Sequence, residues 1–166
     1  MTQTDYHSDI QSIKLHFPEN HAQTTKLEKE RQRVLKDLTK RSQFRPENNN
    51  NAPYCIDLYI ADNKLIFNIK SQLQEELPTL ILSLSPYKKI IKDYFMIIDS
   101  YEALRSKAMA SKLETIDMAR RGIHNEAAEL MMERLDGKIK LDMDTARGLF
   151  TLICVLYISN PKSGWV

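Results

Sequence analysis

Alternation of apolar and polar residues predicts a small β-sheet in the first half of the chain. The segments 54–60 and 65–69 alternate over their whole length, and a turn signal at 61–63 between them predicts a β-hairpin. The segment 10–17 alternates in its second half and predicts a first strand. The segment 79–85 places leucines at every second position and predicts a further strand.

Apolar residues spaced by three and four positions predict four helices. These helices span 22–43, 86–106, 111–135 and 144–158, and a short edge strand is predicted at 138–142. Either Asp142 or Asp144 caps the last helix. The resulting order is β-α-β-β-β-α-α-(β)-α. It predicts an α+β fold in which four helices cover a small antiparallel sheet of three to five strands.

The length of 166 residues predicts one domain, and a composition of 42% hydrophobic and 28% charged residues is typical of globular proteins. We expect a frayed N-terminus at 1–9, a single domain at 10–160 and a C-terminal tail at 161–166. Within the domain, the asparagine-rich segment 48–51 predicts a disordered loop.

The longest apolar run, 149–158, has ten residues, whereas a membrane span needs about 20. Cys55 and Cys154 lie far apart in apolar runs, and without a signal peptide they predict free thiols in a reducing compartment. We therefore expect a cytoplasmic protein with no membrane partner. Because the helix 144–158 is apolar on nearly all sides, it predicts either a central core helix or self-association through that helix.

Charged residues interrupt the apolar face of the helix 111–135. Asp117, Arg120 and His124 fall within or at the edge of this face, and Arg121 lies beside them. Burying a charge costs several kcal/mol unless it is paired, so these residues need an explanation. Adding two expected neighbours from the preceding helix, the candidate ligand-binding residues are Asp117, Arg120, Arg121, His124, Tyr94 and Tyr101.

Two interpretations of this cluster stay open. In one, the arginines bind a phosphate or carboxylate group and His124 exchanges a proton near neutral pH. In the other, Asp117 and Arg120 form an internal ion pair and His124 bonds to a neighbouring helix or a tyrosine. Gly122 lies in the middle of the helix, which costs about 1 kcal/mol relative to alanine. Its presence predicts that another group approaches the helix closely there.

Three functional classes follow from these residues. The preferred one is a non-catalytic binding or interaction module with a small anionic ligand or a protein partner at His124. The second is an enzyme acting on a phosphate-containing substrate. In that class His124, the one candidate catalytic residue, is the acid/base, Arg120 and Arg121 hold the phosphate, and Asp117 orients one of them.

The third class is an RNA- or ribosome-associated protein that uses the basic helix 26–45. The segment 20–46 holds eight Lys or Arg against three Asp or Glu, and Lys88, Lys89 and Lys92 could extend a basic surface. The helix lacks interleaved aromatic residues and the net charge of the chain is only +2, so nucleic acid is not the expected partner.

No metal site and no cofactor are expected. His124 is followed by alanine at the third and fourth positions, which leaves it without a second ligand on its own helix face. The acidic residues of the same helix lie on its other side and predict a solvent-exposed strip at Glu126, Glu129 and Glu133.

Three long runs of the sequence resemble a known family. They are ILSLSPYKKIIKDYFMI, DMARRGIHNEAAELMMERL and KIKLDMDTARGLFTLICVLY. Through these runs the chain is identified as a member of an alphaproteobacterial family of unknown function, the uncharacterised protein family 0262, with a resemblance over about 10–158. The resemblance implies a small cytosolic bacterial protein, and it carries over no activity and no catalytic residues.

Overall fold

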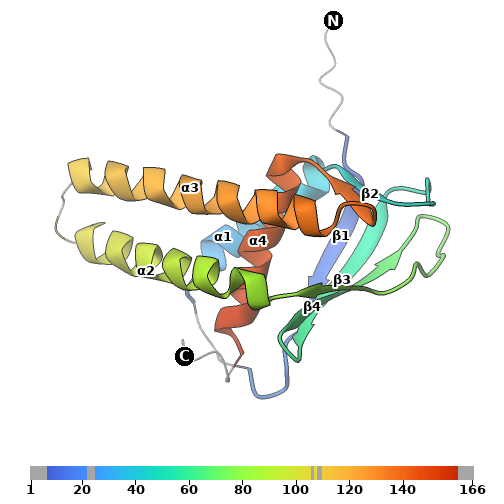
Figure 1. Cartoon of the computed structure of the whole chain (residues 1–166), viewed down its shortest axis with the longest axis horizontal. Coiled ribbons are helices and arrows are strands. Elements are labelled where there is room, and N and C mark those ends of the chain that lie inside the picture. The colour runs from blue at the N-terminus through green and yellow to red at the C-terminus, as the bar shows by residue number, and fades with distance from the viewer. Residues whose placement is uncertain (1–6, 22–24, 106, 108–109, 161–166) are drawn as a thin grey trace, which may run out of the picture.

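The computed structural model describes residues 7–21, 25–105, 107 and 110–160. Its elements, in chain order, are β1 (Ile10–Leu15), α1 (Glu28–Lys40), β2 (Phe44–Pro46), β3 (Tyr54–Ala61), β4 (Lys64–Lys70), β5 (Leu80–Ser83), a 3-10 turn (Ser85–Tyr87), α2 (Lys88–Arg105), α3 (Ala110–Arg134), β6 (Ile139–Leu141) and α4 (Met143–Ile158). Figure 1 shows the sheet on one side of the molecule and the helices on the other. The α+β class predicted from the sequence is confirmed.

The main sheet has the strand order β1-β3-β4-β5 and is mixed rather than antiparallel. β3, β4 and β5 pair antiparallel as expected, but β1 runs parallel to β3. The reason is the connection: α1 lies between β1 and β3, and a crossover through a helix returns the chain in the same direction. The predicted hairpin between β3 and β4 is confirmed, and its turn residues Asp62 and Asn63 have positive φ angles of 50° and 59°.

A second sheet pairs β2 with β6, in antiparallel register from Phe44 opposite Leu141 to Pro46 opposite Ile139. The edge strand predicted at 138–142 is therefore confirmed, whereas β2 was not expected. The helix predicted at 22–43 is shorter, because α1 begins at Glu28 and ends at Lys40. Residues 22–24 lie outside the described part of the chain.

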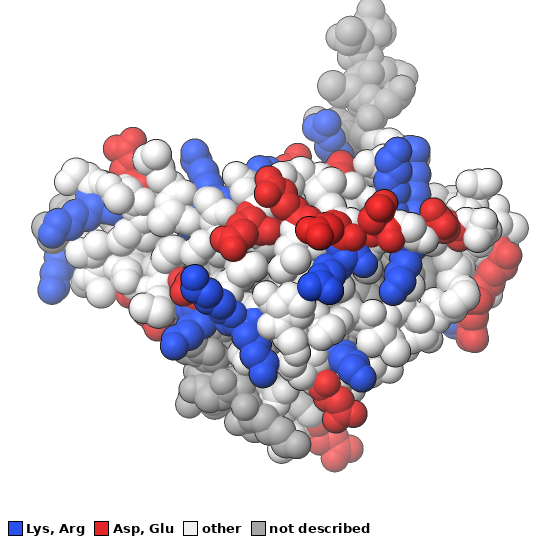
Figure 2. All heavy atoms as spheres, viewed as in Figure 1, with Lys and Arg blue, Asp and Glu red and all other residues white. Residues whose placement is uncertain are grey.

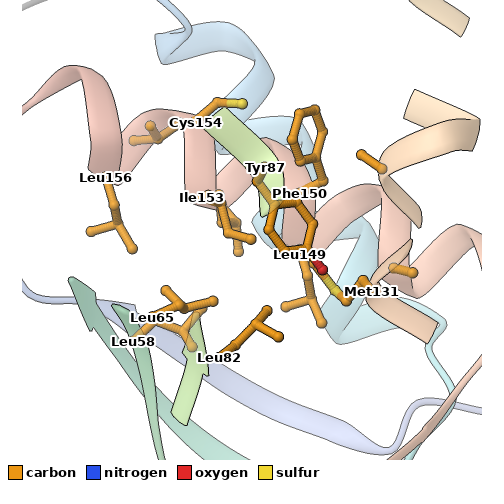
Figure 3. Packing of buried hydrophobic residues seen from close by; sticks show 14 of the residues in the cluster. Leu58, Leu65, Leu82, Tyr87, Met131, Leu149, Phe150, Ile153, Cys154 and Leu156 are labelled. Atoms are coloured by element: carbon orange, nitrogen blue, oxygen red, sulfur yellow. The ribbon is translucent and has the colours of Figure 1, made fainter. Parts of the chain in front are cut away.

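α4 is the central helix of the core. Figure 3 shows Leu149, Ile153 and Leu156 of α4 facing a layer of leucines from β3, β4 and β5. All of these side chains are buried. α4 also packs against α1 and α3. Its N-cap is Asp142, whose carboxylate accepts a hydrogen bond from the Thr145 amide. The apolar composition that suggested self-association is thus accounted for by burial inside the chain, and self-association stays a prediction.

α2 and α3 form an antiparallel helical hairpin that runs past α4 (Figure 1). The buried residues of α3 lie in its C-terminal half, at Ala127, Ala128 and Met131. Figure 2 shows a band of acidic side chains on this half of the hairpin. The acidic strip was predicted correctly, because each of its members is solvent-exposed: Glu126, Glu129 and Glu133.

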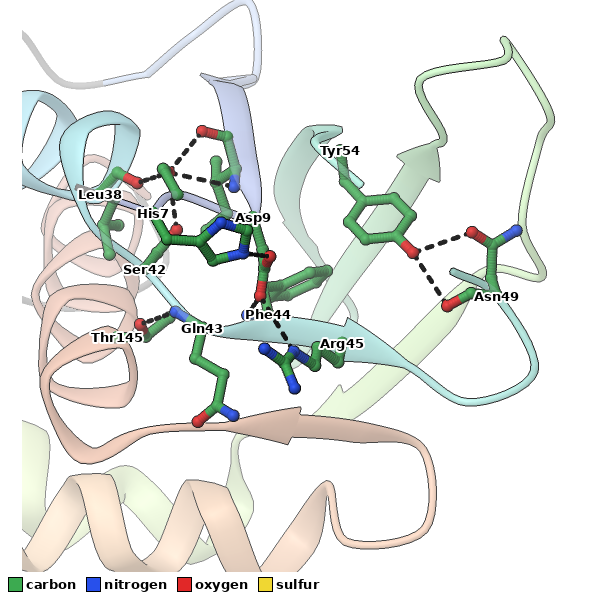
Figure 4. A network of polar contacts seen from close by, with 12 residues as sticks. His7, Asp9, Leu38, Ser42, Gln43, Phe44, Arg45, Asn49, Tyr54 and Thr145 are labelled. Carbon is green, nitrogen blue, oxygen red and sulfur yellow. Dashed lines mark hydrogen bonds and ion pairs between the residues drawn. The ribbon is translucent and has the colours of Figure 1, made fainter. Parts of the chain in front are cut away.

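The N-terminal segment is tied to the domain by a buried carboxylate (Figure 4). Asp9 is 2% exposed, and its side chain accepts the amide of Phe44 at 2.9 Å and pairs with His7 and Arg45. The neighbouring Ser8 hydroxyl donates to the Leu38 carbonyl at the end of α1. Residues 7–9 make these contacts in the structure, residues 1–6 lie outside the described part, and the frayed N-terminus expected at 1–9 stays a prediction.

The asparagine-rich segment 48–51 is a loop, as predicted, and hydrogen bonds connect it to other parts of the chain, whereas its disorder stays a prediction. The Tyr54 hydroxyl donates to the side-chain oxygen of Asn49 at 2.8 Å (Figure 4). The side-chain amide of Asn51 donates to the Glu75 carboxylate. These partners lie on β3 and after β4, which the local sequence could not indicate. No helix in the described part of the chain is long and apolar enough to cross a membrane.

Candidate functional site

A pocket of about 620 Å³ opens between α1, α3 and α4, and Tyr94 of α2 contributes to its wall. We call it the His124 pocket. It is lined by Arg33, Val34, Asp37, Leu38, Lys40, Arg41, Tyr94, Arg120, Arg121, His124, Asn125, Asp142, Asp144, Arg147, Gly148 and Thr151. Three helices that are distant in sequence therefore bring polar side chains to one concave surface.

Gly148 of α4 allows α1 to pack closely against the floor of this pocket. A Cβ atom at Gly148 would lie 3.2 Å from Cδ2 of Leu38 and 3.3 Å from Cγ1 of Val34, tighter than ordinary van der Waals contact. A larger residue here would push α1 away from α4. The absence of a side chain at Gly148 thus places the basic residues of α1 over the start of α4.

Basic residues outnumber acidic ones around the His124 pocket. Six Lys or Arg line it against three Asp, which gives a lining charge of +3 with His124 neutral. Two of the acids are already engaged: Asp142 caps α4, and Asp144 pairs with Arg147 at 2.8 Å. The side chain of Arg147 also donates to the Asn125 side-chain oxygen.

Four of the basic side chains have no carboxylate within 4.0 Å in the part of the chain that the structure describes. They are Arg33, Lys40, Arg41 and Arg121. Arg120 has only a long contact, 3.5 Å from its Nη2 to Oδ1 of Asp117. Like charges held at one surface repel one another, so the pocket has a positive potential that favours an anion.

His124 lies at the inner wall of the pocket with both ring nitrogens engaged. Its Nδ1 is 3.0 Å from the Arg120 carbonyl oxygen, and its Nε2 is 3.2 Å from the Thr151 hydroxyl on α4. The ring also makes edge contacts with Tyr94 and Phe150, at centroid distances of 4.9 and 5.7 Å. A carbonyl oxygen only accepts, so Nδ1 carries the proton and Nε2 is the nitrogen that titrates.

The pKa of His124 is lowered below its ordinary value. Burial is the largest cause, because removal from water penalises the charged imidazolium. The hydrogen bond to the Arg120 carbonyl opposes this effect, and the positive charges of Arg120, Arg33 and Arg147 lower the pKa further. His124 is therefore neutral at neutral pH, surrounded by guanidinium groups.

The structure brings together four of the six residues that the sequence singled out: Tyr94, Arg120, Arg121 and His124 all line the pocket. Asp117 does not line it and contacts Arg120 from outside. Tyr101 lines a different pocket of about 540 Å³, between the start of α1, the second half of α2 and α3, to which Arg120 also contributes.

Sequence reasoning missed the contribution of α1 and α4 to this site. The excess of basic residues at 20–46 was visible, but it indicated a solvent-facing or RNA-binding helix rather than a pocket wall. Lys88, Lys89 and Lys92, which would have extended that basic surface, do not line the pocket. Nothing in the local sequence marks Arg147 or Asn125, because only the packing of α4 on α3 brings them together.

The structure also bears on the predictions about Gly122 and about a metal site. No other described part of the chain approaches Gly122, because a Cβ atom there would meet nothing within 4 Å beyond its own helix backbone, and the approach of another molecule stays a prediction. The described residues also contain no group of three or more His, Cys, Asp or Glu side chains arranged to hold a metal ion.

The chain is similar to proteins from several bacteria. Residues 7–159 match the sequence model of a family described as "Uncharacterised protein family (UPF0262)". UPF0262 proteins of Agrobacterium fabrum and Rhizobium meliloti are 49% and 50% identical over 135 residues, which cover 81% of this chain and 85% of each relative. A UPF0262 protein of Erythrobacter litoralis is 48% identical over 138 residues, covering 81% of this chain and 86% of the relative. No solved structure matches the chain.

Proposed function

Since the chain belongs to the uncharacterised protein family UPF0262, we propose a function from its own geometry: it is a non-catalytic binding module that takes an anionic ligand in the His124 pocket. The observation that carries this proposal is the excess of positive charge. Arg33, Lys40, Arg41 and Arg121 have no carboxylate partner among the described residues and line one concave surface. Guanidinium groups bind phosphate and carboxylate oxygens in a bidentate manner, so an anion would supply the missing partners.

The arrangement of His124 favours binding over acid/base catalysis. A general acid or base needs a ring nitrogen within reach of the substrate, but Nδ1 faces the Arg120 carbonyl and Nε2 faces Thr151. The lowered pKa also favours the neutral ring while the pocket is empty, and in that state Nε2 has no proton to donate. His124 in this proposal shapes the pocket wall and holds α3 against α4.

The proposal places the protein in the cytoplasm. Its support is chemical: Cys55 and Cys154 are both free in the described structure, and thiols stay reduced in that compartment.

Isothermal titration calorimetry with sulfate and pyrophosphate, at constant ionic strength, tests the proposed function. We expect the wild type to bind at least one of these anions, because the pocket offers unpaired guanidinium groups. The double variant Arg33→Gln/Arg121→Gln removes two of them. A hydrogen bond to a charged group contributes about 1.5–3 kcal/mol, so binding should weaken about tenfold or more.

The matched control is Arg134→Gln, which removes one positive charge from an exposed position of α3 that does not line the pocket. The affinity of this variant for the anion should stay within about twofold of the wild type, because salt screens the long-range field of one exposed charge. Absence of binding by the wild type, or an equal loss in the control variant, contradicts the proposed function.

A further inference from the structure

We propose that the ligand group of the His124 pocket is a dianion of the phosphate or sulfate type, and that it binds together with one proton taken up at Nε2 of His124. This inference rests on the proposed function and adds to it the charge of the ligand and a linkage to pH. It is carried by the hydrogen-bond chain from His124 through Thr151 to α4 and by the charges that face the imidazole.

The hydrogen-bond chain can accommodate both protonation states of His124 without moving any heavy atom. Thr151 is 3% exposed, and its hydroxyl oxygen lies 3.2 Å from Nε2 and 3.3 Å from the Arg147 carbonyl. With His124 neutral, the single hydroxyl proton points to Nε2, which accepts it. With His124 charged, Nε2–H donates to the hydroxyl oxygen, and the hydroxyl proton turns to the Arg147 carbonyl.

In each state Nδ1–H continues to donate to the Arg120 carbonyl. The step therefore consists of one proton from solvent adding to Nε2 and one hydroxyl proton rotating. Neither state leaves a ring nitrogen of His124 without a partner.

The charges around His124 keep the ring neutral while the pocket is empty. α1 and its C-cap contribute Arg33, Asp37, Lys40 and Arg41, and α3 contributes Arg120 and Arg121. α4 and its N-cap contribute Asp142, Asp144 and Arg147, and α2 contributes the neutral Tyr94. The groups whose charges act most on the ring are the guanidinium groups of Arg120, Arg33 and Arg147. Two of the acidic groups, Asp142 and Asp144, are already engaged with the Thr145 amide and with Arg147.

An anion seated on these guanidinium groups would reverse the balance. Its negative charge offsets the repulsion that disfavours imidazolium, and an opposite charge nearby favours the charged form of a histidine. By linkage, a ligand that favours the protonated state binds more tightly as the proton concentration rises.

The charge count favours a dianion over a monoanion. The lining carries +3 with His124 neutral and +4 once His124 is protonated. A single carboxylate offsets only one of these charges and leaves the remaining guanidinium groups without partners. A tetrahedral dianion has enough acceptor oxygens for more than one guanidinium fork.

NMR titration of the histidine ring protons tests the inference, with sulfate as the probe and chloride at equal ionic strength as the reference. Sulfate keeps two negative charges across the range of the titration, so any pH dependence belongs to the protein. We expect saturating sulfate to raise the pKa of His124 by at least about half a unit. His16 is the internal control, because it is exposed and pairs with Asp57 on the sheet.

The dissociation constant of sulfate should fall in the wild type as the pH is lowered from about 8 to about 5, approaching about threefold for a shift of half a unit, and stay flat in the His124→Gln variant. Acetate at the same ionic strength should bind at least about tenfold more weakly than sulfate, because it carries half the charge.

The outcomes separate the two proposals. If sulfate shifts the amide signals of the pocket, such as Gly148, while the His124 titration and the dissociation constant do not respond, the proton linkage is overturned and the proposed function stands. If acetate binds as tightly as sulfate, the dianion class is overturned. If neither anion affects the pocket, both the proposed function and this inference are overturned.

Discussion

Two polar clusters contact α1, and they balance charge in opposite ways. At the end of the helix, the buried Asp9 carboxylate accepts the Phe44 amide and pairs with His7 and Arg45. Along the same helix, the His124 pocket holds six basic residues against three acidic ones, and two of those acids are engaged elsewhere. The charged groups of the Asp9 cluster have partners within the chain, whereas the His124 pocket has basic side chains without a carboxylate partner among the described residues.

This difference separates a structural network from a binding site. A buried carboxylate with amide and cationic partners fixes the chain path, and removing it leaves its partners unsatisfied. Unpaired cations on a concave surface repel one another, and this repulsion destabilises the fold without a compensating contact inside the chain. Residues that lower the stability of the fold in this way are expected where a protein binds a ligand.

The largest effect on stability is expected at Asp9. In Asp9→Ala the buried Phe44 amide loses its acceptor, and the partners His7 and Arg45 lose theirs, so the free energy of unfolding should fall by about 2–3 kcal/mol. Urea denaturation followed by circular dichroism measures this change. Asp57→Ala is the matched control, since Asp57 is 43% exposed where it pairs with His16, and its loss should cost at most about 0.5 kcal/mol. Equal effects in the two variants would contradict the structural role of Asp9.

A smaller difference is expected between two buried tyrosines. The Tyr54 hydroxyl, beside the Asp9 cluster, donates to Asn49, so Tyr54→Phe should destabilise the protein by about 1 kcal/mol. The Tyr87 hydroxyl is buried in the core, on the side of Met131 in Figure 3, and has no hydrogen-bond partner among the described residues. Tyr87→Phe should therefore be neutral or stabilising, and the same denaturation experiment compares the two. A loss of about 1 kcal/mol at Tyr87 would mean that its hydroxyl has a partner after all.

A pH-dependent effect is expected at His124. Its pKa in the folded protein is lower than in the unfolded chain, where it is about 6.5, so the unfolded chain binds the proton more readily. The stability contributed by neutral His124 is complete above about pH 6.5 and is lost as the pH falls through the window below that value. Denaturation at several pH values without added anion should show the stability gap between wild type and His124→Gln narrowing on acidification. A gap that widens would contradict the lowered pKa.

The smallest effects on stability are expected at the pocket arginines. Arg121 is exposed and has no carboxylate partner in the described structure, so Arg121→Gln should change the free energy of unfolding by no more than about 0.5 kcal/mol. Relief of repulsion from Arg120 and Arg33 makes a slight gain the expected sign. Arg134→Gln, on the same helix and outside the pocket, serves as the control. A loss above about 1 kcal/mol at Arg121 would place it in a structural network like that of Asp9.

Periodicity in the sequence was enough to predict the α+β class, the β3–β4 hairpin and the position of α4. It could not predict β2, because a three-residue strand containing Pro46 has no pattern and forms only by pairing with Ile139 and Leu141. The direction of β1 relative to β3 was also hidden, since it depends on where α1 crosses the sheet.

The candidate site was predicted as far as one helix can indicate it. Arg120 and His124 interrupt an apolar face, and that anomaly is local to α3. The positions of Arg33 and Arg147 depend on how closely α1 and α4 pack, which is set by the contact of Gly148 with Leu38. Helical spacing within one segment contains no information about that contact.

The most direct test of the central claim is to locate a bound anion. In a crystal of the wild-type protein soaked in selenate, anomalous scattering from selenium marks the position of the anion. We expect a peak in the His124 pocket within hydrogen-bonding reach of Arg33 or Arg121, and no such peak for Arg33→Gln/Arg121→Gln. Selenate peaks elsewhere on the wild-type protein, with the His124 pocket empty, would contradict it.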